Sequence, residues 1–249
     1  MNQLRFNLFG SPQITHQGQP LTGFVSTKVR ALLIYLAVTA RPHSRDHLAH
    51  LLWEDTPASM KTNLRKALSN LRQLIGDLLV EDGKELVTLD QQRCWVDVVA
   101  FERALKSGAL TEAAQLYTAD FLDGFNPSLS YEFEAWTLRK QSRLKSGMVD
   151  LLRKLATQQE TRYTLPEAIG TVRRLLDLEP WQEESHRWLM TLLAKNGQRG
   201  AALAHFEVCK RVLQEELAVE PAPETMALVQ DGVNKPRAKR RAACPERST

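Results

Sequence analysis

Hydrophobic positions change their period twice along the N-terminal part of the chain. Residues 4–10 alternate apolar and polar side chains, and Ser-Pro and Gln-Gly pairs follow them, which predicts short strands joined by turns. Residues 26–39, 44–53 and 57–75 then carry apolar side chains at helical spacing, which predicts three helices. Asp82-Gly83 lies between two strand-like runs and predicts a β-hairpin over residues 79–89.

The third predicted helix separates apolar from cationic side chains. Ser44 is expected to cap the second helix, and Pro57 suits the first turn of the third. One helical stripe is expected to be buried and consists of Met60, Leu64, Ala67, Leu68, Leu71, Leu74 and Ile75. The opposite side carries Lys61, Thr62, Arg65, Lys66, Ser69 and Arg72.

No acidic residue lies between Pro57 and Gly76. A helix with a solvent face of cations and hydroxyls gains nothing from ion pairs within itself, so the face suits a polyanion. Lysine and arginine bind phosphates, and arginine can also bind guanine in the major groove. The alternative interpretation of this helix alone is a solvated surface.

The strand pattern disappears from residue 98 onward. Amphipathic segments rich in Ala and Leu follow, separated by short Gly, Pro or Asn breaks. Ala168 and Ala202 stand 34 residues apart, and each begins a helix with a large apolar residue four positions later, which is the period of tetratricopeptide helix pairs. We therefore expect packed helical hairpins over residues 97–233, and a basic disordered tail over 234–249.

Composition and charge narrow the function classes. The 249 residues are 43% hydrophobic and 25% charged, as in globular proteins. The net charge of +4 divides into +3 over residues 1–96, −4 over 97–234 and +5 over 235–249, which hints at nucleic acid for one part and protein contacts for another. The apolar run 31–38 is too short to span a membrane and the N-terminus lacks a signal-peptide pattern, so a cytoplasmic protein without membrane contact is expected.

Two sets of sequence segments resemble a known family. LRFNLFGSPQI, TKVRALLIYLAV, SRDHLAHLLW, TNLRKALSNLRQLIG and the following hairpin resemble the OmpR/PhoB-type winged helix of the Streptomyces antibiotic regulatory protein (SARP) family. WVDVVAFE, ADFLDGF, YEFEAWTLRKQSRL and VEPAPET are similar to the bacterial transcriptional activator domain that follows it there. The resemblance implies an α+β winged helix over residues 1–96 and an all-α, tetratricopeptide-like domain over 97–233.

The same resemblance implies a sequence-specific activator that binds promoter DNA. Residues expected at the DNA are Ser44, Arg45, Lys61, Thr62, Arg65, Lys66, Ser69, Arg72 and, at the tip of the wing, Lys84. Asn63 stands where the family often has Asn, and a packing or capping role is equally open. The implied partners are double-stranded DNA with direct repeats, RNA polymerase with its sigma factor, and a second copy of the chain.

Other candidate sites are weaker. The aromatic residues of the second half are expected in the core, Trp181 as a packing anchor, and Glu183, Glu184 and His186 on a solvated surface. His43, His47 and His50 are expected on a surface near DNA rather than around a metal. The three cysteines form no metal pair, and no phosphate loop, dinucleotide motif or nucleophile elbow occurs, so neither a cofactor nor enzymatic activity is expected.

Two alternatives to the activator remain open. The chain is either a short regulator or a truncated relative of a larger one that contains an ATPase module. A different class of function is a helical-repeat adaptor in which the winged helix only docks proteins. Binding of a peptide by residues 97–234, together with absent DNA binding, would favour the adaptor.

Overall fold

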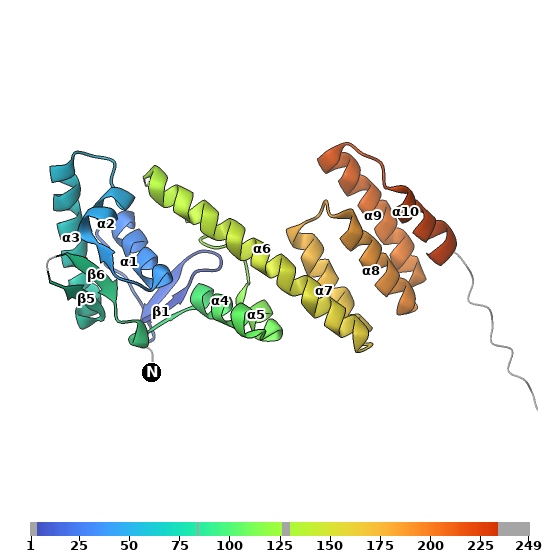
Figure 1. Ribbon diagram of the computed structural model, residues 1–249, viewed down its shortest axis with the longest axis horizontal. Coiled ribbons are helices and arrows are strands. Elements are labelled where there is room, and N and C mark those ends of the chain that lie inside the picture. Colours follow the sequence, from blue (N-terminus) through green and yellow to red (C-terminus); the bar gives the residue numbers. More distant parts are fainter. Residues whose placement is uncertain (1–3, 84, 126–129, 234–249) are drawn as a thin grey trace, which may run out of the picture. The chain divides into compact units, whose positions relative to one another are not determined.

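The computed structural model describes residues 4–83, 85–125 and 130–233. The chain folds into two compact units, Met1–Leu151 and Leu152–Thr249. Figure 1 shows strands among the helices in the blue and green part of the chain, and helices alone from yellow to red. The predicted order is confirmed at this level: small sheets occur near the N-terminus, and the C-terminal part that the structure describes is helical.

The first sheet has the strand order β3-β2-β1-β7. Its strands are β1 (Leu4–Asn7), β2 (Gln13–His16), β3 (Gln19–Pro20) and β7 (Cys94–Val96). Strand β1 runs antiparallel to β2 and parallel to β7, with Phe6 opposite both Ile14 and Val96. These three apolar side chains are buried, whereas Arg5 is exposed, so the sheet buries one face.

Helix α1 (Thr27–Thr39) is the centre of the N-terminal unit. Val29 and all eight residues from position 31 to 38 are buried, so nearly every side of this helix faces protein. It packs against α2 (Arg45–Leu52), α3 (Pro57–Ile75), β6 (Leu86–Leu89) and β7. Tyr35 also meets the ring of Trp136 edge-on at 4.9 Å between centroids.

Helices α2 and α3 begin as predicted. Ser44 Oγ accepts the His47 N–H at 3.2 Å, and Pro57 occupies the first turn of α3. The predicted apolar stripe of α3 is buried, except that Leu74 is only half-buried. The buried set also contains Asn70, which accepts the Val25 N–H at 3.1 Å and donates to the Gly23 carbonyl at 3.2 Å. Asn70 therefore ties the segment before α1 to α3.

A second sheet has the order β4-β6-β5. The predicted hairpin is present as β5 (Leu79–Asp82) and β6, with Glu81 opposite Val87. A short helical turn, η1 (Gly76–Leu78), connects α3 to β5. Strand β4 (His43–Ser44) pairs with β6 and brings the start of α2 next to the hairpin.

Asp97 joins the first sheet to α4 (Asp97–Ser107). Its buried carboxylate accepts the N–H groups of Leu8 at 2.6 Å, Phe9 at 3.0 Å and Val98 at 2.7 Å. Burial raises the pKa of this carboxyl, and the three N–H donors act in the opposite direction. The carboxylate thus fixes the end of β1 against the start of α4.

The last helix of the N-terminal unit begins at the end of α2. Helix α5 (Leu110–Leu116) packs against α4, and α6 (Tyr131–Thr161) continues into the second unit. At the start of α6, Glu54 Oε1 accepts the Tyr131 N–H at 2.6 Å, and Ser130 Oγ donates to the Leu51 carbonyl. The end of α2 is therefore bonded to the start of α6.

The second unit contains the expected helical hairpins. After the end of α6 come α7 (Leu165–Leu178), α8 (Glu183–Lys195), α9 (Arg199–Leu217), α10 (Pro223–Ala227) and η3 (Leu228–Val233). Ala168 and Ala202, the two positions of the 34-residue repeat, are both fully buried in one apolar core. Each small side chain lets a neighbouring helix approach closely.

Two expectations about this unit are wrong. His186 is buried rather than solvated: its Nδ1 lies 2.9 Å from His205 Nε2, and its Nε2 lies 2.7 Å from the Pro180 carbonyl. Trp181 is 44% exposed and is not a packing anchor. Glu183 is partly buried and accepts the Ala222 N–H at 2.8 Å, so it holds the start of α10.

We expect Asp97→Ala to lower the free energy of unfolding of the N-terminal unit by about 2–4 kcal/mol, since it leaves three N–H groups without their acceptor. Urea unfolding followed by circular dichroism measures this loss. Asp123→Ala, at an exposed position, is the matched control and should change stability by less than about 0.5 kcal/mol. Equal stability of the two variants would contradict the role of Asp97.

Candidate nucleic-acid interface

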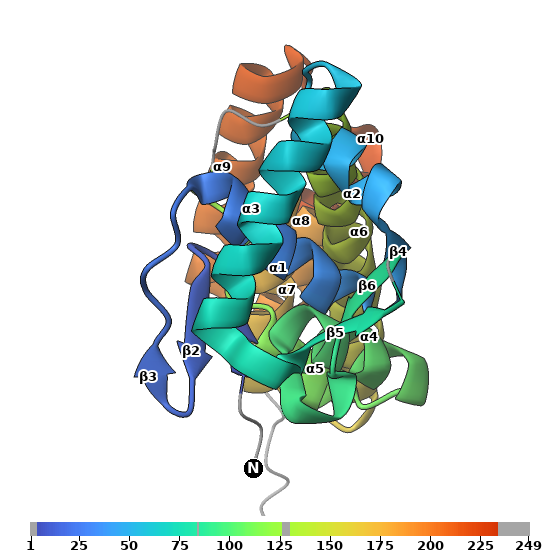
Figure 2. The same cartoon turned by 90° about the vertical axis from the view of Figure 1, so that its left-hand side faces the viewer.

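Helix α3 lies on the outer side of the N-terminal unit. In Figure 2 it is nearest the viewer, in front of α1, and the β5–β6 hairpin follows its lower end. All six side chains expected on its polar face are exposed: Lys61, Thr62, Arg65, Lys66, Ser69 and Arg72. The face runs from the start of α2 to the hairpin, because both elements pack against α3.

A hollow of about 420 Å³ brings four of the candidate residues together. It lies between the start of α2 and the first turns of α3 and is lined by Ser44, Arg45, Lys61 and Arg65, with Asp46, Leu64 and Glu85. Two N–H groups at the start of α2 already have acceptors, because Arg45 donates to the Glu85 carbonyl at 2.9 Å and His47 donates to Ser44 Oγ at 3.2 Å. Thr62, Lys66, Ser69 and Arg72 are outside the lining and lie along α3.

The face is not purely cationic, contrary to the sequence-based interpretation. Glu81 of β5 accepts hydrogen bonds from both Arg45 and Arg72. Asp46 of α2 forms an exposed ion pair with Lys61 at 3.1 Å. The acidic partners come from other elements, which a search of the α3 sequence alone could not reveal.

The position of Glu81 in the sequence nevertheless indicates that its side chain is partly buried and needs a partner. It stands two positions after Leu79 in a strand, so the two side chains share the inward face of the hairpin. A carboxylate on an inward face needs a cation or hydrogen-bond donors to offset the cost of its burial. Leu79 is buried and the Glu81 side chain is only 16% exposed, in agreement with this pattern.

The other candidates differ in their surroundings. The side chains of Arg65 and Lys66, exposed in the middle of α3, form neither a hydrogen bond nor an ion pair with any residue that the structure describes. Thr62 donates its hydroxyl to the Ala58 carbonyl at 2.9 Å, and the half-buried Asn63 donates to Ser59 Oγ at 3.5 Å. Lys84, predicted at the tip of the wing, lies outside the described residues.

The histidines near this face do not form the surface that was expected. His43 is buried, with its Nε2 2.7 Å from Thr39 Oγ1, and its ring stacks on His47 at 5.4 Å. His47 in turn bonds the hydroxyl of Tyr35 at 2.9 Å. His43 therefore belongs to the packing between α1 and α2, and only His47 and His50 are exposed.

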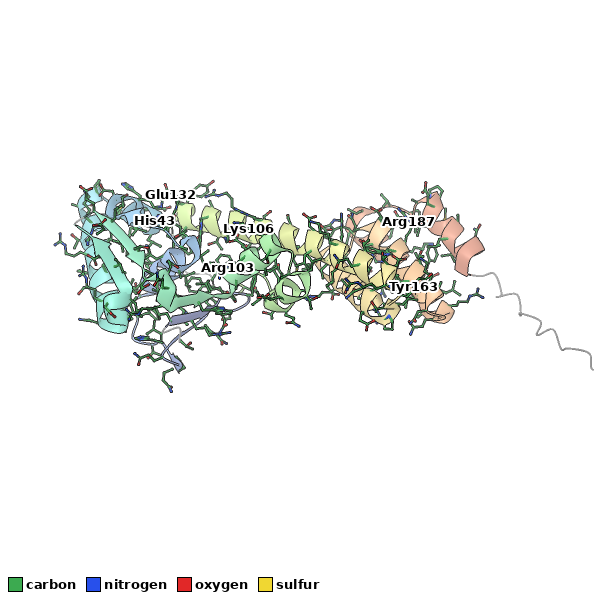
Figure 3. The ribbon with its side chains drawn as sticks, turned by 60° about the horizontal axis from the view of Figure 1, so that its bottom comes forward. His43, Arg103, Lys106, Glu132, Tyr163 and Arg187 are labelled. Atoms are coloured by element: carbon green, nitrogen blue, oxygen red, sulfur yellow. The ribbon has the colours of Figure 1, made fainter. Side chains whose placement is uncertain are left out.

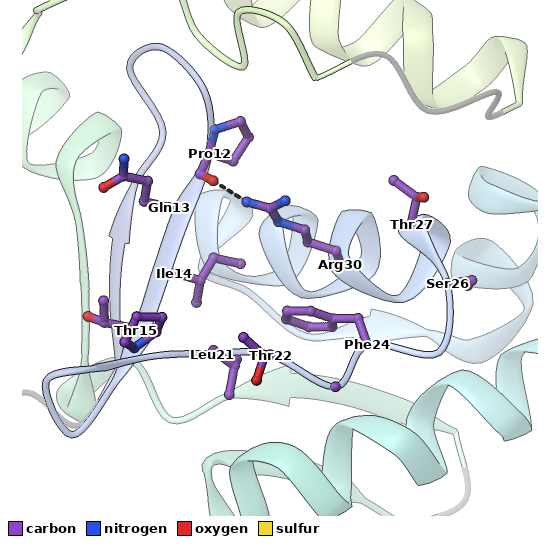
Figure 4. A pocket seen from close by; sticks show the side chains of 12 residues that line it. Pro12, Gln13, Ile14, Thr15, Leu21, Thr22, Phe24, Ser26, Thr27 and Arg30 are labelled. Carbon is purple, nitrogen blue, oxygen red and sulfur yellow. Dashed lines mark hydrogen bonds between the residues drawn. The ribbon is translucent and has the colours of Figure 1, made fainter.

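A second hollow, of about 800 Å³, lies between β2, residues 21–26 and α1 (Figure 4). Ile14, Leu21 and Phe24 provide apolar walls, and Arg30 bonds the Pro12 carbonyl. Among the residues that the structure describes, no aspartate, glutamate, histidine or cysteine lines it. Within the described residues, no group of three or more possible ligands is arranged to hold a metal, and no helix is long and apolar enough to cross a membrane.

The family of the chain is identified from its helical region. The model of the family "bacterial transcriptional activator domain" matches residues 96–231, more than half of the chain. The chain belongs to this family. The predicted membership of the SARP family of transcriptional regulators is thereby confirmed, since named regulators also match along nearly the whole chain.

Named regulators that resemble this chain differ in length, so the chain covers a different share of each. It is 27% identical over 242 residues to transcriptional regulatory protein MoaR1 of Mycobacterium bovis, covering 90% of this chain and 78% of MoaR1. It is 28% identical over 240 residues to regulatory protein AfsR of Streptomyces coelicolor, covering 91% of this chain but 24% of AfsR. The chain thus spans most of one relative and about a quarter of the other.

A solved structure shares the fold. EmbR of Mycobacterium tuberculosis, in complex with a low-affinity phosphopeptide, matches with a TM-score of 0.62 and 21% identity. The match covers 92% of this chain and 65% of that chain, just under two thirds. At this identity the likeness shows the fold, including the small N-terminal sheets and the helical region after them.

Burial, reinforced by the charge of Arg41 and by His47, lowers the pKa of His43 to about 4. An unfolded chain binds a proton there near pH 6.5, so between pH 6.5 and 4 the unfolded state takes up a proton that the folded state rejects. Stability is therefore lost as the pH falls through this window, by about 1–2 kcal/mol for His43 between pH 7 and 5.

Urea unfolding at several pH values tests this. The variant His43→Gln should lose less stability than the wild type between pH 7 and 5, whereas His50→Gln, at an exposed position, should keep the wild-type dependence. An unchanged pH dependence in the His43 variant would show that this ring is not protected from protonation.

Proposed function

We propose that this chain is a sequence-specific, double-stranded DNA-binding transcriptional activator. Residues 1–96 act as a winged helix, in which α3 enters the major groove and the β5–β6 hairpin reaches the neighbouring backbone. The order of α2, a four-residue turn, α3 and a hairpin supports this assignment. Membership of a family named for transcriptional activation supports the role in transcription.

The observation that carries the proposal is the exposed cationic face of α3 beside the start of α2. Arg65 projects from the middle of α3 with no acidic partner among the described residues, so it is the residue we assign to a base edge. Lys61 and Lys66 suit phosphates, and Thr62, Ser69 and Arg72 extend the contact along the helix. Ser44 and Arg45 lie where the N-terminus of α2 can hold a further phosphate.

The helical region, residues 97–233, is proposed to pair protomers on direct repeats and to contact RNA polymerase with its sigma factor. The buried 34-residue repeat supports a tetratricopeptide-like array, a fold that presents extended surfaces to proteins. The basic residues of the tail, 234–249, would add salt-dependent affinity for any DNA sequence.

We expect Arg65→Ala to cost about 1–3 kcal/mol of specific binding, since a bidentate contact to a base is lost. Footprinting on genomic fragments first identifies a bound site, and gel-shift titration at fixed salt then measures its affinity. Lys84→Ala should instead weaken binding to all sequences about equally, because a wing contact to phosphate carries no sequence information.

Arg103→Ala is the matched control. Arg103 is exposed on α4, away from α3 (Figure 3), and its replacement removes the same charge without touching the proposed interface. The proposal fails if the wild type shows no salt-dependent binding to DNA. It also fails if Arg65→Ala and Arg103→Ala bind the selected site equally well.

A further inference from the structure

Glu81 is shared by two cations of the proposed interface. Its Oε1 accepts from Arg72 of α3, and its Oε2 accepts from Arg45 of α2. The carboxylate side chain is 16% exposed, whereas those of Arg45 and Arg72 are 29% and 51% exposed. One acidic group thus connects the hairpin, the start of α2 and the last turn of α3.

A carboxylate bonded to a guanidinium occupies the donors that a phosphate oxygen would use. Glu81 therefore neutralises one of the two positive charges of Arg45 and Arg72 and engages one terminal nitrogen of each, until these bonds open. Arg72 is half-exposed and Arg45 lines the hollow at the start of α2, so DNA phosphates can compete for both. The Nε of Arg45 is buried without a hydrogen-bond acceptor, so Glu81 leaves this guanidinium only partly satisfied.

The pair between Lys61 and Asp46 is different. Both side chains are largely exposed, 63% and 70%, so water and salt screen their attraction. Glu81 lies in a more protected place and bonds two partners. Of Glu81 and Asp46, Glu81 is therefore better placed to compete with DNA phosphates for the arginine side chains of this face.

We propose that Glu81 is a built-in competitor for DNA phosphate, which holds Arg45 and Arg72 away from non-specific DNA. This inference rests on the proposed DNA-binding function and assigns to it a residue that opposes binding. Phosphate contacts carry no sequence information, so withholding two of them lowers affinity for random DNA. A residue that only oriented Arg72 for DNA would have the opposite effect when replaced.

The test compares Glu81→Gln with Asp82→Asn on a random-sequence duplex. Both variants remove one negative charge from β5, but Asp82 is exposed and bonds no arginine among the described residues. Each arginine released to a phosphate steepens the dependence of log K on log salt by about 0.9, equivalent to about 3.5-fold more affinity lost between 50 and 200 mM salt. We expect tighter binding at low salt and a slope steeper by about 1–2 for Glu81→Gln, and a smaller change for Asp82→Asn.

A heparin column gives a readout that does not require DNA binding. Glu81→Gln should elute at higher salt than Asp82→Asn, although the two proteins have the same net charge. Adding Arg72→Gln to Glu81→Gln should remove part of the gain. Circular dichroism and urea unfolding establish that each variant is folded at the temperature of the binding measurements.

The outcomes separate the two proposals. If the wild type binds no DNA, the proposed function fails, and the heparin comparison still decides whether Glu81 masks the arginines. If the wild type binds DNA but Glu81→Gln matches Asp82→Asn in slope and elution, the competitor role is wrong. Weaker DNA binding by folded Glu81→Gln would overturn it in favour of an orienting role.

Discussion

Helix α1 is apolar on nearly every side, and such a helix is stable in water only when protein surrounds it. The first sheet, α2, α3 and the second sheet supply most of this cover, and Trp136 of α6 meets Tyr35 from outside residues 1–96. Helices α2 and α3, which are proposed to bind DNA, therefore pack around the same central helix as α6, which lies in the region that matches the activator-domain family. The compact N-terminal unit accordingly extends beyond residue 96, to Leu151.

Three carboxylates in this unit show how burial and neighbours decide what one chemical group does. Asp97 is buried, forms no ion pair among the described residues and is satisfied by backbone N–H groups, so it joins two elements. Glu81 is partly buried and bonds two arginines, so it alters the charge that the proposed interface presents. Asp46 is exposed, and its pair with Lys61 contributes little because water screens it.

The sequence predicted the elements that depend on local patterns. The first three helices, the Ser44 cap, the hairpin around Gly83 and the buried repeat positions Ala168 and Ala202 all follow from spacing along a short segment. Strands β4 and β7 were missed, because two or three residues carry no pattern and their partners lie far along the chain. Buried His43 and His186 were misplaced for a related reason: polar side chains enter a core when distant residues provide their hydrogen bonds.

The sequence by itself determined which side of α3 is apolar and which side carries lysine and arginine, since helical periodicity fixes both. It also determined the family, through segments spread along the chain. Only the tertiary structure decided the charge that this side presents, because Glu81 and Asp46 reach it from β5 and α2. Electrostatic interactions depend on distance in space, and separation along the chain does not specify that distance.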